Sequence, residues 1–136
     1  MKAFYVPAVE LPEVWQEIRP LVAIFVKDSS LRYGESDVFW ALAKGFWDLW
    51  VVEDEGKITS ILLGYVVQYP KCKAYEPIAV MGTDMRGWLK FYPDFEAWVK
   101  RERNCSMIRP TAQLGWERVL RRFGYGKTHV VLIKEL

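Results

Sequence analysis

Apolar residues recur along the chain with two different periods, and these periods divide it into helices and strands. The first third predicts a short extended start at residues 2–9, a helix from Pro12, and a second helix after Gly34 that ends near Gly45. Pro20 lies inside the first helical pattern, so it should kink that helix or divide it in two. The apolar stripe of the second helix consists of Val38, Phe39, Leu42 and Phe46.

Three strand patterns follow in succession. They cover residues 48–53, 58–69 and 74–81 and are rich in β-branched and aromatic residues. The first two are joined by a hairpin turn in which Gly56 takes a positive φ, and Gly64 marks a possible bulge in the second. The pattern predicts an antiparallel meander.

The order of elements then changes to helix, strand, helix, strand. The first of these helices carries Pro93, which should either kink it or mark a helix that starts late. Residues 105–109 form a strand that returns through a crossover and is therefore parallel to strand 74–81. A helix over 114–123 and a closing strand over 128–133 complete the pattern. The sequence predicts an α/β (α+β) fold with a mixed sheet flanked by helices, in one domain over residues 1–136.

Composition excludes several classes of protein. The chain has 136 residues, 51% of them hydrophobic, a net charge of +2 and one His. This charge is too weak to favour nucleic-acid binding, no apolar run is long enough for a membrane span, and the chain start lacks the apolar core of a signal peptide. Cys72 and Cys105 are expected to be free thiols in a reducing cytoplasm, and no metal site is expected.

Aromatic and arginine-rich clusters are the candidate interaction surfaces. Aromatic residues make up 15% of the chain and include seven Trp, which either pack the core or form a protein-binding face. Trp40, Trp47 and Trp50 are close in sequence. The basic side consists of Arg109, Arg118, Arg121 and Arg122. It either faces solvent or contacts an acidic partner or a phosphate.

Three short motifs, together with the order of elements, resemble the GNAT acetyltransferase family. Residues 78–80 (IAV) look like the family's LAV at the end of its fourth strand, and Arg86-Gly87 look like the start of its phosphate loop. Residues 120–125 (LRRFGY) look like the family's YEKLGF. The resemblance covers roughly residues 8–136 and implies a GNAT-like domain that binds acetyl-CoA.

The coenzyme site implied by the resemblance lies after strand 74–81. Its residues are Val80, Met81, Gly82, Arg86 and Gly87. Backbone amides there would hold the coenzyme diphosphate, with the charge of Arg86 assisting. Leu89 and Phe91 stand where the family has glycines, which makes the loop degenerate. The alternative is an ordinary β-to-α turn in which Gly82 supplies a positive φ and Asp84 caps the helix.

Two residues are candidates for catalysis. Glu76 lies on strand 74–81, where family members can carry a carboxylate that deprotonates an amine. Tyr125 is the candidate proton donor to the leaving thiolate. The tyrosine that many family members use as general acid corresponds to Leu120, and their asparagine seven residues earlier corresponds to Gln113. The alternatives are a solvated edge glutamate and an aromatic residue that fills the slot after Gly124.

Two functions follow from the resemblance. The first is an N-acetyltransferase that transfers acetyl from acetyl-CoA to an amine. The second is an inactive GNAT-fold interaction or structural protein that binds a protein partner, or a second copy, through an aromatic-rich surface. The phrases LWVV, MGTDMRGWL and GWERVLRRFGY are similar to small GNAT-like proteins of tailed bacteriophages. That similarity implies a place in the host cytoplasm or the virion, and an amine acceptor on a host or phage protein.

Overall fold

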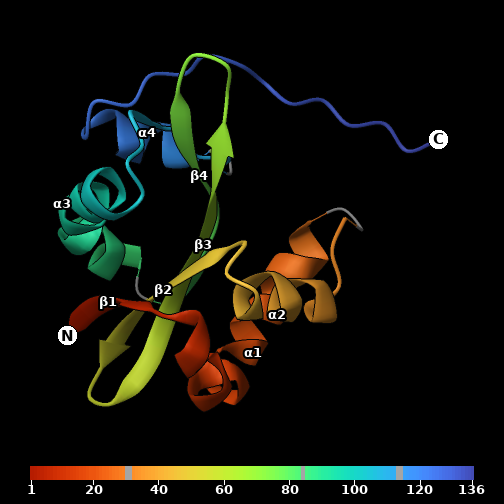
Figure 1. The fold of residues 1–136 in the computed structure, drawn as a ribbon, viewed down its shortest axis with the longest axis vertical. Coiled ribbons are helices and arrows are strands. Elements are labelled where there is room, and N and C mark those ends of the chain that lie inside the picture. The colour runs from red at the N-terminus through yellow and green to blue at the C-terminus, as the bar shows by residue number, and fades with distance from the viewer. Residues whose placement is uncertain (30–31, 84, 113–114) are drawn as a thin grey trace.

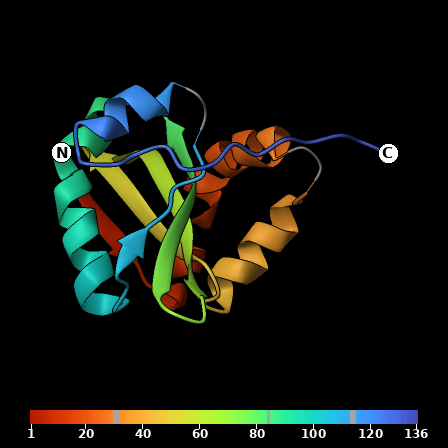
Figure 2. The ribbon, with the colours of Figure 1, turned by 90° about the horizontal axis from the view of Figure 1, so that it is seen from above.

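The sheet is the centre of the molecule, with helices on both faces (Figures 1 and 2). The structure is a computed structural model that describes residues 1–29, 32–83, 85–112 and 115–136. The strands, in spatial order, are β1 (Lys2–Val6), β2 (Asp48–Asp54), β3 (Lys57–Gln68), β4 (Lys73–Gly82) and β5 (Met107–Ile108).

Strands β1 to β4 are antiparallel neighbours, and β5 is parallel to β4. Glu55 and Gly56 join β2 to β3 with φ of 52° and 77°, so the predicted positive-φ turn is confirmed. The mixed sheet of meander and parallel crossover confirms the predicted fold class. The prediction of a closing strand over 128–133 is wrong, because these residues have no strand partner in the described structure.

Helices α1 (Leu11–Asp28) and α2 (Glu35–Ala43), preceded by the short 3-10 helix η1 (Ala8–Glu10), cover one face of the sheet. Helices α3 (Met85–Glu102) and α4 (Trp116–Arg121) cover the other. Pro20 lies inside an uninterrupted α1, so a division of that helix is wrong. Pro93 lies inside α3, which begins at Met85, so a late start is wrong as well. No helix in the described residues is long and apolar enough to cross a membrane.

The central strands are apolar on both faces, because each face carries its own core. On β2, Leu49 and Val51 pack towards α1 and α2, whereas Trp50 and Val52 pack towards α3. This alternation within a continuous apolar run is what a strand between two helical layers requires.

A bulge in β4 interrupts this alternation. Leu63 of β3 pairs with Ala79 and the next residue, Gly64, pairs with Pro77, so Ile78 is the extra residue. As a result Tyr75 and Val80 both pack into the α3-side core, although they are five positions apart and a regular strand would place them on opposite faces. The predicted register shift beside Gly64 is confirmed, but the predicted strand is wrong, because the extra residue belongs to β4 and not to β3.

Gly64 is required by the ring of Tyr75. A Cβ at Gly64 would lie 2.5 Å from Cε1 of that ring, which is fully buried and whose hydroxyl is bonded to Asp48. We expect Gly64→Ala to lower the free energy of unfolding by about 1–3 kcal/mol, measured by urea denaturation, because the ring has little room to move. Gly126→Ala is the matched control, since a Cβ at Gly126 meets nothing within 4 Å. Equal losses in the two variants would contradict this role of Gly64.

Candidate functional site

A cleft opens where β4 and the chain after β5 separate. The amide of Arg109 donates to the carbonyl of Tyr75 (2.7 Å), and that of Thr111 donates to the carbonyl of Pro77 (3.0 Å). Beyond Pro77 a cleft of about 100 Å³ lies between the two segments. Its walls are residues 77–81 of β4, residues 110–112, and Trp88, Leu89, Tyr92, Trp116 and Leu120 from the helices.

The cleft is narrow and mostly apolar. Trp88 is buried, and its indole Nε1 has no hydrogen-bond partner among the described residues. Leu89 lines the cleft, whereas Phe91 is not among its lining residues. A narrow, mostly apolar cleft of this shape suits a thin, flexible chain.

The predicted coenzyme residues occupy three different environments. Val80 and Met81 line the cleft. Gly82 ends β4 against β3, where a Cβ would lie 2.2 Å from Cβ of Ser60. Gly87 is buried inside α3, so the predicted turn over residues 81–87 is shorter than expected. Asp84 and the side chain of Arg86 lie outside the part of the chain that the structure describes.

Glu76 is held by two side chains that the sequence did not assign to it. Its carboxylate accepts a hydrogen bond from the hydroxyl of Tyr69 (2.8 Å) and forms an ion pair with Nη1 of Arg109 (3.3 Å). The guanidinium of Arg109 also lies over the ring of Tyr69, 5.3 Å from its centroid, and hydrogen-bonds its hydroxyl. The bond to Glu76 raises the pKa of Tyr69. With its side chain 14% exposed, Glu76 is not the solvated edge glutamate of the alternative interpretation.

Glu76 lies on the face of the sheet opposite α3. Tyr75 packs into the α3-side core, and successive side chains of a strand alternate, so Glu76 faces α1 and α2. Its register partner Tyr65 stacks on Trp47 with centroids 6.0 Å apart. Burial, and next the charge of Glu76, raise the pKa of Tyr65. The next residue along β4, Pro77, is the first residue of the cleft wall, so Glu76 precedes the cleft by one position and lies beside an aromatic wall.

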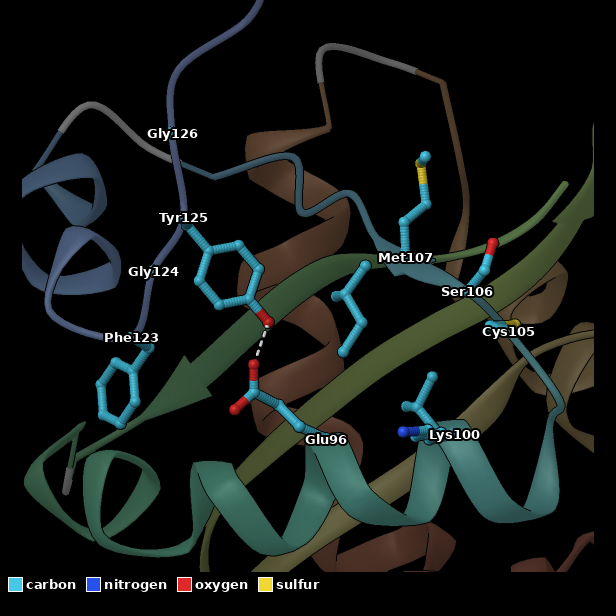
Figure 3. Close-up of a pocket in the computed structure, with 11 residues that line it drawn as sticks. Glu96, Lys100, Cys105, Ser106, Met107, Phe123, Gly124, Tyr125 and Gly126 are labelled. Atoms are coloured by element: carbon cyan, nitrogen blue, oxygen red, sulfur yellow. Dashed lines mark hydrogen bonds between the residues drawn. The ribbon is translucent and has the colours of Figure 1, made fainter.

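Tyr125 lies in a different place. It lines a second cavity of about 480 Å³ between α3, β5 and residues 123–126, and Figure 3 shows its hydroxyl pointing at Glu96. The hydroxyl donates to Oε2 of Glu96 (2.6 Å), and burial raises its pKa far above the ordinary value for tyrosine. The structure does not bring Tyr125 together with Glu76, and Tyr125 is absent from the cleft wall.

The described residues hold no group of three or more His, Cys, Asp or Glu side chains suited to a metal ion. Cys72 and Cys105 are both free thiols, and burial raises the pKa of Cys105.

The fold matches solved acetyltransferases over their whole length. A ribosomal-protein-alanine N-acetyltransferase from Brucella melitensis biovar Abortus 2308 has a TM-score of 0.71 at 14% identity, with 100% of both chains covered. An aminoglycoside acetyltransferase from an uncultured soil metagenomic sample, in complex with sisomicin, has a TM-score of 0.68 at 16% identity, with 99% of this chain and 95% of that chain covered. A predicted acetyltransferase from Clostridium acetobutylicum, with acetyl-CoA, has a TM-score of 0.65 at 13% identity, with 98% and 95% covered.

These similarities define the class of fold. The chain has the fold of the GNAT acetyltransferases, with the strand order, the crossover and the separation of β4 from the chain after β5 described above. No protein-family description matches the sequence, and no curated protein matches it.

Proposed function

We propose that this protein is an N-acetyltransferase that transfers acetyl from acetyl-CoA to an amine. The observation that carries the proposal is the position of Glu76, a largely buried carboxylate one residue before the wall of a cleft that separates β4 from the chain after β5. A carboxylate beside a slot of this kind places a proton acceptor next to the end of a thin ligand. The structural similarity to acetyltransferases, one of them solved with acetyl-CoA, supports the same reaction.

The residues of the cleft fit the pantetheine arm of the coenzyme. Val80, Met81 and Leu89 would lie along the arm. The start of α3, an 18-residue helix that follows β4 closely, supplies the positive end of a helix dipole for the diphosphate. When bound, the coenzyme supplies the acetyl thioester.

The protein's own part in the reaction falls to Glu76. Its carboxylate would accept the proton of the attacking amine, directly or through a water molecule. Tyr69 and Arg109 fix the orientation of that carboxylate from two sides. The acceptor would approach from the face of α1 and α2, where Trp47 and Tyr65 form an aromatic wall beside Glu76.

Coenzyme binding is tested by filling the cleft. Ala112 lines the cleft from an exposed loop position, so Ala112→Trp should occupy the space of about 100 Å³ without disturbing the core. We expect acetyl-CoA to raise the melting temperature of the unmodified protein, and Ala112→Trp to abolish the shift. Ala97→Trp, at an exposed position of α3 outside the cleft, is the control and should keep the shift. No heat in isothermal titration of the unmodified protein at millimolar acetyl-CoA would refute the proposal.

The second candidate is a GNAT-fold protein without the activity that binds a protein partner. It is favoured by the size of the cleft, since ligand pockets are typically about 300–1,000 Å³ and this cleft has about 100 Å³. It is also favoured by two exposed aromatic residues near the end of α2, Trp40 (58% exposed) and Phe46 (72%). This candidate predicts a stable complex and no release of free thiol from acetyl-CoA. The similarity to phage proteins, and with it a host or virion location, stays a prediction.

A further inference from the structure

The largest exposed apolar run of the described chain lies in the segment over residues 128–136, which we call the tail. Val130, Val131, Leu132 and Ile133 are 63%, 75%, 89% and 66% exposed, and the tail has no helix or strand. Along an extended chain Val130 and Leu132 point to one face, and Val131 and Ile133 to the other. A segment that is apolar on both faces is typical of a strand inside a sheet, covered on both sides.

A place for such a strand exists at the edge of the sheet. Strand β5 is the last in the order, and the amides of Ser106, Arg109 and Thr111 all donate to β4, so the other edge of this segment carries no strand in the described structure. The 480 Å³ cavity lies against this edge, with α3 as its floor (Figure 3). A strand occupies about 150 Å³ per residue, from its rise, the spacing of strands and the thickness of a layer, so the cavity holds roughly three residues.

The tail of the same chain begins on the wrong side of this cavity to enter it directly. Residues 123–126, which come just before the tail, form the far wall of the cavity. Tyr125 is fixed there by its bonds to Glu96 (2.6 Å) and to the carbonyl of Leu120 (3.3 Å). From this wall the tail runs away from the cavity and past the body of the molecule in both views (Figures 1 and 2). Filling the cavity from the same chain would need a sharp reversal at residues 126–127.

We propose that the tail of one copy enters this cavity of a second copy, pairs with its β5 edge, and receives the other tail in return. Both halves of the contact lie on one chain, so two copies are complementary to each other about a two-fold axis. Nine extended residues from each copy, with the surface they cover, bury on the order of 2,000 Å² in total, which is enough for a stable dimer. Addition of a strand to an open edge also satisfies backbone groups that otherwise bond only to water.

The oligomeric state of the full chain tests the exchange. We expect the protein to be a dimer by light scattering at micromolar concentration, and Leu132→Glu to be a monomer whose melting temperature is at or below that of the dimer. The matched control is Val9→Glu, because Val9 is 84% exposed in η1, away from the cavity; it should stay dimeric. A monomeric unmodified protein, or a dimeric Leu132→Glu variant, would overturn the proposal.

A cross-link locates the contact. Copies with Met107→Cys and copies with Val131→Cys, both with Cys72 replaced by serine, are mixed and oxidised. We expect a disulfide-linked heterodimer, since Met107 lines the cavity and is 44% exposed. In a single chain that carries both cysteines, we expect links between chains. A link within one chain would show that the tail closes on its own β5, and the exchange would be wrong.

Discussion

Replacing Glu76 by glutamine is expected to lower kcat/KM for acetyl transfer about 10²- to 10⁴-fold, the usual contribution of a positioned proton acceptor. Glutamine keeps the size of the side chain but cannot take the proton of the attacking amine. The rate would be followed by release of free thiol from acetyl-CoA. Affinity for acetyl-CoA, measured by calorimetry, should hardly change, because Glu76 is not part of the cleft wall.

The control for this prediction is Glu55→Gln, in the exposed turn between β2 and β3, which should keep full activity. Tyr69→Phe removes one hydrogen bond to Glu76 and leaves the carboxylate in place. The Tyr69→Phe variant should lose less activity than Glu76→Gln, and its kcat should depend on pH differently from that of the unmodified protein. If Glu76→Gln kept full activity, the Glu76–Arg109 ion pair would be a structural link between β4 and the chain after β5.

Replacing Asp48 by alanine is expected to lower the free energy of unfolding by about 3–5 kcal/mol, the range for removing one partner of a buried ion pair. The carboxylate of Asp48 accepts two bonds from Arg103, at 2.9 and 3.0 Å, and one from the hydroxyl of Tyr75 at 3.0 Å. Its side chain is 7% exposed and that of Arg103 is 26% exposed. Without Asp48, the guanidinium of Arg103 and the buried hydroxyl of Tyr75 lose these three bonds, and Arg103 keeps the carbonyl of Glu102 as an acceptor.

The bond to Asp48 raises the pKa of Arg103, and burial raises that of Tyr75, so arginine stays charged and tyrosine neutral at any ordinary pH. The loss of unfolding free energy in Asp48→Ala, measured by chemical denaturation, should therefore be constant across neutral pH. Glu102→Ala is the control, because Glu102 pairs with Arg101 at the surface, with side chains 50% and 65% exposed, and exposed pairs contribute about 0–1 kcal/mol. A loss below 1 kcal/mol for Asp48→Ala would show that water replaces the pair.

Local pattern predicted most elements because their residues determine them locally. The meander from β2 to β4, its hairpin at Gly56 and the bulge beside Gly64 follow from strand propensity and glycine placement. The closing strand at 128–133 was wrong for a different reason. Its residues favour a strand, but a strand also needs an edge to pair with, and the sequence does not say where that edge lies.

The candidate site was predicted only in part because its contacts depend on register and on distance along the chain. Glu76 was predicted from the family resemblance at its place on the strand, whereas Tyr69 and Arg109, seven and 33 residues away, were not assigned to it. Gly82 and Gly87 were predicted as phosphate-loop residues. In the structure, Gly82 is required because a larger side chain would collide with Ser60, and Gly87 lies inside helix α3. A sequence motif contains no information on either contact.

The bulge at Ile78 has a consequence for changes in chain length. Because Tyr75 and Val80 share one core across this extra residue, deletion of the Ile78 codon would remove the bulge and leave both side chains on the α3 side, four positions apart. Ala79 and Met81 would likewise stay in the α1-side core. Deletion of one residue where the strand alternates regularly, such as Val51 of β2, would instead exchange the two faces of the strand beyond it. Natural or engineered variants should therefore tolerate the loss of one residue at the bulge far more readily than within β2.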